Sequence, residues 1–232
     1  MAGARPMKTL CLLFLCWTTL AAADAGDEFA RRCARLAAEA RVEVRFEDGV
    51  LTRDDRRGSA ELQHLARGAP SPYHSVLGLT RAEPAVTLVH TATVLAEANG
   101  RVCAVPAVTL TLGFAVLQVH LARELGDACR RAIVDAHEQE HVAVWRDHFR
   151  AGARRLQPRL QSQLGPAEVF NNAAEARELL GQRVDGLVAP VLRGLREGID
   201  AAQREIDSPG SYQAVTNRMR ACPTAIGAGR TL

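Results

Sequence analysis

Two histidines and one glutamate near the middle of the chain have the residue types and the spacing of a metal site. They form the pattern H-E-x-x-H in the run His137-Glu138-Gln139-Glu140-His141, and no Pro or Gly interrupts residues 133–142. On a helix of about 3.6 residues per turn, the two imidazoles lie one above the other, so both can reach one tetrahedral ion such as Zn²⁺. Glu138 then lies beside the ion, where it can accept a proton from bound water. The spacing predicts His137 and His141 as zinc ligands and Glu138 as the general base of a hydrolytic reaction.

An apolar stripe on the same helix indicates that these three motif residues face inward. At about 100° per residue, the stripe contains Val134, Trp145, Phe149 and Leu156. The motif residues fall within or beside it. A buried carboxylate without a partner costs several kcal/mol, which favours a metal ion over a pair of ordinary core histidines.

A third ligand is expected, because a catalytic zinc usually has three protein ligands and one water. His148 is too distant on a straight helix, since the seven residues that separate it from His141 correspond to about 10 Å of rise. No histidine follows His148, so a downstream ligand must be a carboxylate. If the following helix folds back near Gly165, both Glu178 and Asp185 are candidates, and the spacing does not separate them.

The first 25 residues have the parts of a secretory signal peptide. Basic residues precede an apolar run over residues 10–20, and small residues follow it, so cleavage after Ala23 or Ala25 fits the A-x-A rule. The apolar run is short for a membrane span, and no second such stretch follows. We expect a secreted or periplasmic protein without stable membrane insertion after removal of the signal.

Four cysteines remain after that removal: Cys33, Cys103, Cys129 and Cys222. An even number in an oxidising compartment predicts two disulfides, for which three pairings are possible. We favour Cys103 with Cys129, which would tie a strand to the start of the motif helix. The second pair would then be Cys33 with Cys222, which would join the two ends of the chain.

The charges give no indication of a nucleic-acid partner. The formal net charge is +3 at pH 7, from 29 basic and 26 acidic residues that are interleaved along the chain. Nucleic-acid binding requires clustered cations, usually with aromatic side chains for stacking. The charges therefore predict no nucleic-acid partner, and the predicted hydrolytic motif favours a peptide or protein substrate.

Hydrophobic periodicity and turn residues predict an α+β fold. We expect a helix over residues 27–40, a strand over 42–46 and helical turns over 59–66. A hairpin around Asn99-Gly100 should join strands over residues 85–95 and 102–112, and a third run over 115–121 leads to the motif helix. That helix should begin after Asp127 and end near Leu156, before Pro158. A long amphipathic helix over 172–207 and a short one that begins at Ser208-Pro209 should follow.

These elements give a small, mostly antiparallel sheet packed on the motif helix and followed by long C-terminal helices. We predict a signal peptide at residues 1–25, a domain with the sheet and motif helix at 26–165, and a helical part at 166–232 that completes the site. His90 and His120 are expected to be ordinary sheet or surface histidines. Tyr73 and Tyr212 are the only tyrosines, and a packed surface position is expected for both, although one could donate to an oxyanion.

The motif and its setting resemble zincin-type metallopeptidases. More narrowly, they resemble poorly characterised exported bacterial proteins described as zinc-dependent proteases, in which β-strands precede an H-E-Q-x-H helix and a helical part follows. The resemblance covers about residues 86–156. It implies that His137 and His141 are zinc ligands, that Glu138 is the base, and that an edge strand pairs with extended substrate. Glu140 departs from the zincin preference for uncharged residues, and its helix position predicts that it points to solvent.

We therefore expect a secreted or periplasmic zinc-dependent metallopeptidase that hydrolyses peptide bonds. The alternative is a non-catalytic exported binding or envelope-associated protein, in which the motif is a structural or relic zinc site. A structural site would have a fourth protein ligand in place of water.

Overall fold

The computed structural model describes residues 28–66 and 75–223, so the predicted signal peptide at 1–25 lies outside the described residues. Helices and strands both contribute substantially, which confirms the predicted α+β class. In chain order the elements are a helix over 28–36, a 3₁₀ helix (Ala37–Glu39), β1 (Arg41–Phe46), β2 (Thr52–Asp54), α2 (Ser59–Leu65), β3 (Gly78–Ala96), β4 (Val102–Leu121), α3 (Ala128–Leu164), β5 (Glu168–Phe170), α4 (Ala173–Ile206) and α5 (Pro209–Arg220).

The sheet is built on β4. Among the described residues, β1, β2, β3 and β5 all pair with this strand. β2 runs parallel to residues 118–120 of β4, whereas β5 runs antiparallel to residues 102–104. The sheet is therefore mixed, with a parallel pair that the sequence did not predict.

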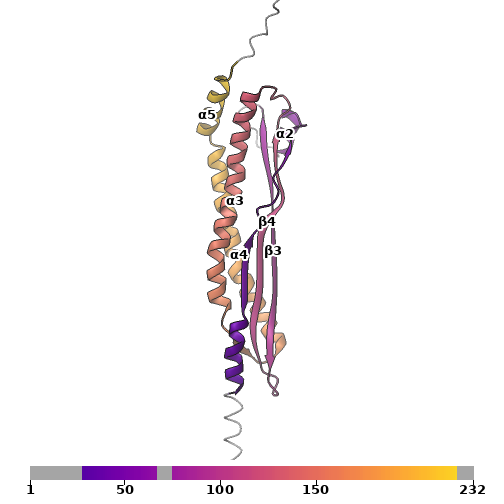
Figure 1. Cartoon of the computed structure of the whole chain (residues 1–232), viewed down its shortest axis with the longest axis vertical. Helices are drawn as coiled ribbons and strands as arrows, with labels where there is room; N and C mark the ends of the chain where they lie inside the picture. The colour runs from indigo at the N-terminus through magenta and orange to yellow at the C-terminus, as the bar shows by residue number, and fades with distance from the viewer. Residues whose placement is uncertain (1–27, 67–74, 224–232) are drawn as a thin grey trace, which may run out of the picture. The chain divides into compact units, whose positions relative to one another are not determined.

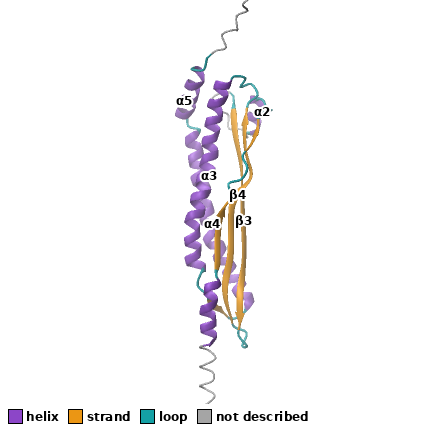
Figure 2. Cartoon of the chain, in the orientation of Figure 1, coloured by secondary structure: helices purple, strands orange, loops and turns teal. Residues whose placement is uncertain are grey.

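β3 and β4 form the predicted hairpin, and Figure 2 shows them as two long strands side by side. Gly100 adopts a φ of 90°, and the Glu97 N–H donates to the Arg101 carbonyl across the turn at 2.8 Å. β4 continues through Gly113, where the sequence suggested a break. A Cβ at Gly113 would lie 3.3 Å from the Glu47 carbonyl oxygen, so this glycine allows the end of β1 to approach β4 closely.

The start of α3 agrees with the sequence prediction, whereas its end does not. Its start is as predicted, since the Asp127 carboxylate accepts the Arg130 N–H at 2.8 Å. The predicted end near Leu156 was wrong, because the helix continues through Pro158 to Leu164. Pro158 removes one backbone donor. The fully buried Leu156 and Leu160 on either side provide the packing that keeps this turn helical.

The motif-bearing part of α3 packs on β4 and α2. Val134 and Val142 belong to a buried cluster with Leu62, Leu117, Val119, Leu121, Ala122 and Leu125. Complete burial of one such side chain contributes about 1.5–3 kcal/mol. Because Val134 and Val142 lie one turn before and after Glu138, their burial directs the motif inward.

α4 and α5 both begin next to the predicted starts, and each start is capped by a side chain. The Asn172 side chain accepts the N–H groups of Ala174 and Glu175, and the Ser208 hydroxyl accepts the Ser211 N–H at 3.3 Å. Figure 1 shows α5 beside the first turns of α3. No helix in residues 28–66 or 75–223 has the length and apolar character of a membrane span.

The described chain divides into two compact units. Each unit contains residues from both of the predicted parts, 26–165 and 166–232, and the motif belongs to the second unit. The first unit contains residues 28–42, 90–107 and 161–184, and the second contains 43–66, 75–89, 108–160 and 185–223.

Two disulfides form, but the predicted pairing was wrong. Cys33 is bonded to Cys103, and Cys129 to Cys222, with Cα–Cα distances of 5.7 and 5.8 Å. The prediction treated Cys103 as close to the motif helix, whereas this residue is the second of the 20 in β4. At about 3.3 Å per residue, such a strand separates its first residues widely from the element that follows it. Cys103 instead packs with the N-terminal helix, in a cluster of Phe29, Cys33, Leu36, Cys103 and Val105.

Candidate metal centre

His137 and His141 direct their rings toward one carboxylate, that of Asp207. The Nε2–Oδ1 distance is 3.6 Å for His137 and 3.1 Å for His141. Both histidines are buried, while the Asp207 side chain is 46% exposed. α3 supplies the two imidazoles one helical turn apart, and the junction between α4 and α5 supplies the carboxylate.

This geometry fits a shared divalent ion. Two donor atoms that each lie about 2.1 Å from one tetrahedral ion are separated by about 3.4 Å. The observed distances of 3.6 and 3.1 Å lie on either side of that value. Two imidazoles and one carboxylate also form a donor set found in catalytic zinc sites, which leave a position for water.

The carboxylate that lies beside the imidazoles is that of Asp207, and not one of the predicted third ligands, Glu178 and Asp185. Both are exposed, and Glu178 accepts a hydrogen bond from Gln182 instead. Neither residue belongs to a group of closely spaced potential ligands in the described chain. The prediction looked within the first turns of the returning helix, but α4 continues for 34 residues before the chain reaches Asp207.

Gln203 fixes the orientation of the His141 ring. Its Oε1 is hydrogen-bonded to His141 Nδ1, and its Nε2 donates to the His141 carbonyl oxygen at 3.1 Å. An Nδ1–H that donates to this amide oxygen leaves the lone pair on Nε2, the atom nearest Asp207. That is the tautomer a metal ligand requires at this position.

The start of β3 holds Glu138, which is only 4% exposed. The Thr80 hydroxyl oxygen lies 2.8 Å from Glu138 Oε2. Gly78 leaves space for the glutamate, since a Cβ at this position would lie 2.8 Å from Glu138 Cγ and 2.7 Å from Val134 Cγ1. The Thr80 hydroxyl and the space left by Gly78 therefore both help to position the Glu138 carboxylate.

The carboxylates of Glu138 and Asp207 and the His141 imidazole influence one another's pKa. Burial raises the pKa of Glu138, and the neighbouring His141 offsets part of this rise. For His141, burial acts most strongly and lowers the pKa, but Asp207 and Glu138 outweigh it, so the net pKa lies above the ordinary value. Burial also acts to raise the pKa of Asp207, but hydrogen bonds to His137 and His141 hold it well below its usual range. Asp207 is therefore an anion at neutral pH, as a metal ligand must be.

Tyr212 belongs to the site, whereas a packed surface position was expected. Its hydroxyl donates to Asp207 Oδ1 at 2.9 Å, and its ring centroid lies 5.5 Å from that of His137. α5 thus orients the carboxylate that follows α4. Tyr73 lies outside the described residues.

The other histidines that the sequence analysis considered have ordinary sheet, helix or surface positions. His120 is buried, with Nδ1 3.8 Å from Asp54 Oδ2, and His90 is exposed on β3. His148 Nδ1 is hydrogen-bonded to the carbonyl of Val144, four residues earlier. Glu140 is exposed, as its helix position predicts.

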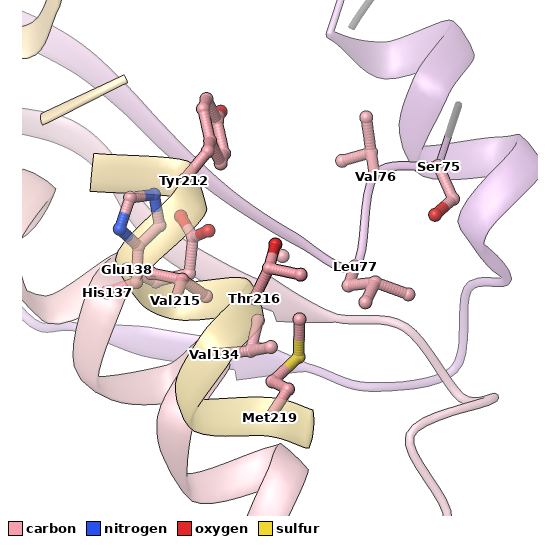
Figure 3. Close-up of a pocket in the computed structure, with 11 residues that line it drawn as sticks. Ser75, Val76, Leu77, Val134, His137, Glu138, Tyr212, Val215, Thr216 and Met219 are labelled. Carbon is pink, nitrogen blue, oxygen red and sulfur yellow. The ribbon is translucent and has the colours of Figure 1, made fainter. Parts of the chain in front are cut away.

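A cavity of about 320 Å³ opens beside His137 and Glu138. Figure 3 shows these two side chains at one end of it, with α5 along one wall and residues 75–77 across from α5. The lining residues are Ser75, Val76, Leu77, Gly78, Val134, His137, Glu138, Tyr212, Val215, Thr216 and Met219. The candidate base therefore faces a space that a ligand can enter.

Comparisons with protein-family models, curated proteins and solved structures give no match to this chain. The interpretation of the site therefore depends on its own geometry. The described residues contain one other group of closely spaced potential ligands, Asp127 with Cys129 and Cys222. Those two sulfurs are joined in a disulfide and are not thiolate ligands.

Proposed function

We propose that this protein is a zinc-dependent metallopeptidase that hydrolyses peptide bonds. The observation that supports this most directly is the convergence of both imidazole Nε2 atoms on the Asp207 carboxylate, with the buried Glu138 on the same helix. His137, His141 and Asp207 would hold the ion. Bound zinc would supply a water of lowered pKa and polarise the substrate carbonyl.

The residues of the chain then have separate tasks. Glu138 accepts one proton from the attacking water as the water oxygen bonds to the carbonyl carbon. When the C–N bond breaks, Glu138 returns that proton to the leaving nitrogen, so the products are a carboxylic acid and an amine. Thr80 keeps the carboxylate oriented during both transfers, and Tyr212 keeps Asp207 in place.

β3 provides a means of holding an extended peptide. Among the described strands, only β4 pairs with β3, which leaves one edge of β3 available beside Gly78 and Glu138. Pairing with such an edge binds the main chain of a peptide with little regard for its sequence. The substrate would therefore be an extended segment of a peptide or protein.

We also propose a secreted or periplasmic location. Two disulfides support an oxidising compartment, since such bonds are rare in the reducing cytosol. The signal-like pattern of residues 1–25 supports the same location.

The decisive experiment measures zinc content and peptide hydrolysis for the wild type, Glu138→Gln and Glu140→Gln. Glu140 is the matched control, because it is an exposed carboxylate on the same helix. All three proteins should bind zinc, and only Glu138→Gln should lose activity, by about 10²–10⁴-fold. Equal activity in Glu138→Gln would reject the assigned base. Stable zinc binding without hydrolysis of any peptide in a diverse library would favour the exported binding protein with a structural site.

A further inference from the structure

A second cavity, of about 530 Å³, lies within the first compact unit. Its volume falls in the range of about 300–1,000 Å³ that is usual for small-molecule sites. β3, β4 and α4 provide its lining residues: His90, Thr91, Ala92, Val94, Pro106, Ala173, Arg177, Leu180 and Val184. None of these residues lines the cavity beside Glu138 or belongs to the candidate metal centre.

One side of α4 and one face of β3 form the two long walls of the second cavity. The α4 residues have the spacing i, i+4, i+7 and i+11, so they follow one side of the helix: Ala173, Arg177, Leu180 and Val184. On β3, His90, Ala92 and Val94 alternate along the strand and therefore share one face. The helical stripe is about 16 Å long, which suits an extended ligand.

The floor of the second cavity is apolar and made of small side chains. Ala92 and Ala173 both pack against a buried cluster of Val102, Ala104, Phe170, Ala176 and Leu180. A methyl group from each wall covers the cluster without filling the space above it. An apolar chain that lies on this floor removes its own surface and that of the floor from water.

The charge at the second cavity has one sign. Arg177 is its cation, and no carboxylate lines it. Arg177 Nε donates to the Ala173 carbonyl oxygen at 3.2 Å, which holds the guanidinium beside the cavity. The His90 ring provides a further polar group, since a Cβ at Gly181, one turn after Arg177, would lie 3.5 Å from His90 Cε1.

The terminal nitrogens of Arg177 are available to an external anion. Arg177 forms no ion pair with the described part of the chain. The carboxylates between residues 168 and 184 each have another partner: Glu168 with Arg183, Glu175 with Asn171, and Glu178 with Gln182. A guanidinium binds a carboxylate through two parallel hydrogen bonds. The second cavity therefore combines an apolar groove with a carboxylate-binding group.

We propose that the second cavity binds a free fatty acid. The alkyl chain lies along α4, and the carboxylate contacts Arg177. Thr91 supplies the one side-chain hydroxyl among the lining residues, so the walls favour methylene groups over a polar ligand. This site is additional to the proposed peptidase function and does not depend on it.

The test is isothermal titration calorimetry with octanoate, decanoate and dodecanoate, each below its critical micelle concentration. The affinity should rise with chain length, by up to about 15-fold for two added methylenes. Decanol lacks the charge and should bind about 5-fold more weakly than decanoate. Zinc should leave these affinities unchanged, because none of the lining residues is a candidate ligand of the metal centre.

Two pairs of variants locate the ligand. Arg177→Gln should weaken decanoate binding about 5-fold and leave decanol binding unchanged, whereas Arg193→Gln, at an exposed α4 position away from the lining, should change neither. Val94→Trp should fill part of the cavity and weaken the binding of both ligands by at least about 10-fold. Val94 is 39% exposed, so the larger ring does not disturb the core. Thr93→Trp, on the opposite face of β3, is its control.

Three results would overturn this proposal. The first is an affinity that does not depend on chain length or on Val94→Trp. The second is binding that requires zinc, which would place the carboxylate at the metal centre. The third is a wild-type dimer in sedimentation that Val94→Trp abolishes, since a second copy of the chain would then cover the cavity. Chain-length dependence that is lost in Val94→Trp, with a charge preference that is lost in Arg177→Gln, would support it.

Discussion

The strongest prediction concerns Asp207, because the sequence alone pointed to other residues. Asp207→Asn preserves the size of the side chain but removes its negative charge. The variant should bind zinc at least about 100-fold more weakly than the wild type. The carboxylate oxygen lies 3.1 and 3.6 Å from the two imidazole nitrogens, so the substitution affects the shared position itself.

The magnitude follows from the surroundings of this side chain. Loss of a hydrogen-bond partner behind a metal ligand typically costs 10–100-fold in affinity, so loss of an anionic ligand should cost about 100-fold or more, or about 2.8 kcal/mol. Asp207 is 46% exposed, which allows water to occupy the vacated position. Binding should therefore weaken without disappearing. The free energy of unfolding of the metal-free protein should change by less than about 1 kcal/mol, as for other partly exposed ion pairs.

The assay is competition for zinc against a chelator of known affinity, with thermal unfolding as a check on the fold. Glu178→Gln and Asp185→Asn are the matched controls, since each removes one exposed carboxylate from α4. Both controls should bind zinc like the wild type. Normal binding by Asp207→Asn, together with a loss in either control, would refute the assignment of the third ligand.

Two further predictions concern neighbouring groups. Thr80→Val removes the hydroxyl beside Glu138 Oε2 and should lower kcat about 10-fold with zinc affinity unchanged, whereas Thr80→Ser should restore most of the rate. Burial lowers the pKa of His120 despite the opposing Asp54 carboxylate, so below about pH 6.5 the unfolded chain takes up a proton that the folded chain does not. The free energy of unfolding should then fall with decreasing pH by up to about 1.4 kcal/mol per pH unit. His120→Gln should reduce this slope, whereas the control variant His64→Gln, at an exposed position, should not.

The part of the site on one helix could be predicted from the sequence, because it depends on local geometry. The i, i+4 spacing of His137 and His141 and the apolar stripe beside them are properties of a single helix. Asp207 could not be assigned in this way, since its position depends on the length of α4 and on where that helix lies. One local signal was available: Ser208-Pro209 predicts a helix start, so a side chain immediately before it lies at a break between helices.

The fold was predictable where local signals agreed and less so where packing overrode them. Caps at Asp127 and Ser208 marked two helix starts correctly. Gly113 and Pro158 predicted breaks, yet a close strand neighbour and buried leucines keep the elements continuous there. An even number of cysteines implied two disulfides, but the pairing depends on tertiary proximity that their spacing does not encode.

The segment over residues 207–222 contributes to three parts of the site: the candidate ligand set, the orientation of its carboxylate and the wall of the cavity beside Glu138. Asp207 completes the candidate ligand set, Tyr212 orients that carboxylate, and Met219 forms a wall of the cavity. Cys222 then bonds to Cys129 at the first turn of α3, the helix that contributes both histidines. Because the Cys129–Cys222 disulfide fixes this segment against that helix, the same bond holds the candidate third ligand near the imidazoles and the apolar wall near Glu138. The metal affinity and the shape of the cavity beside Glu138 therefore share a structural origin, and any change that displaces α5 should alter both together.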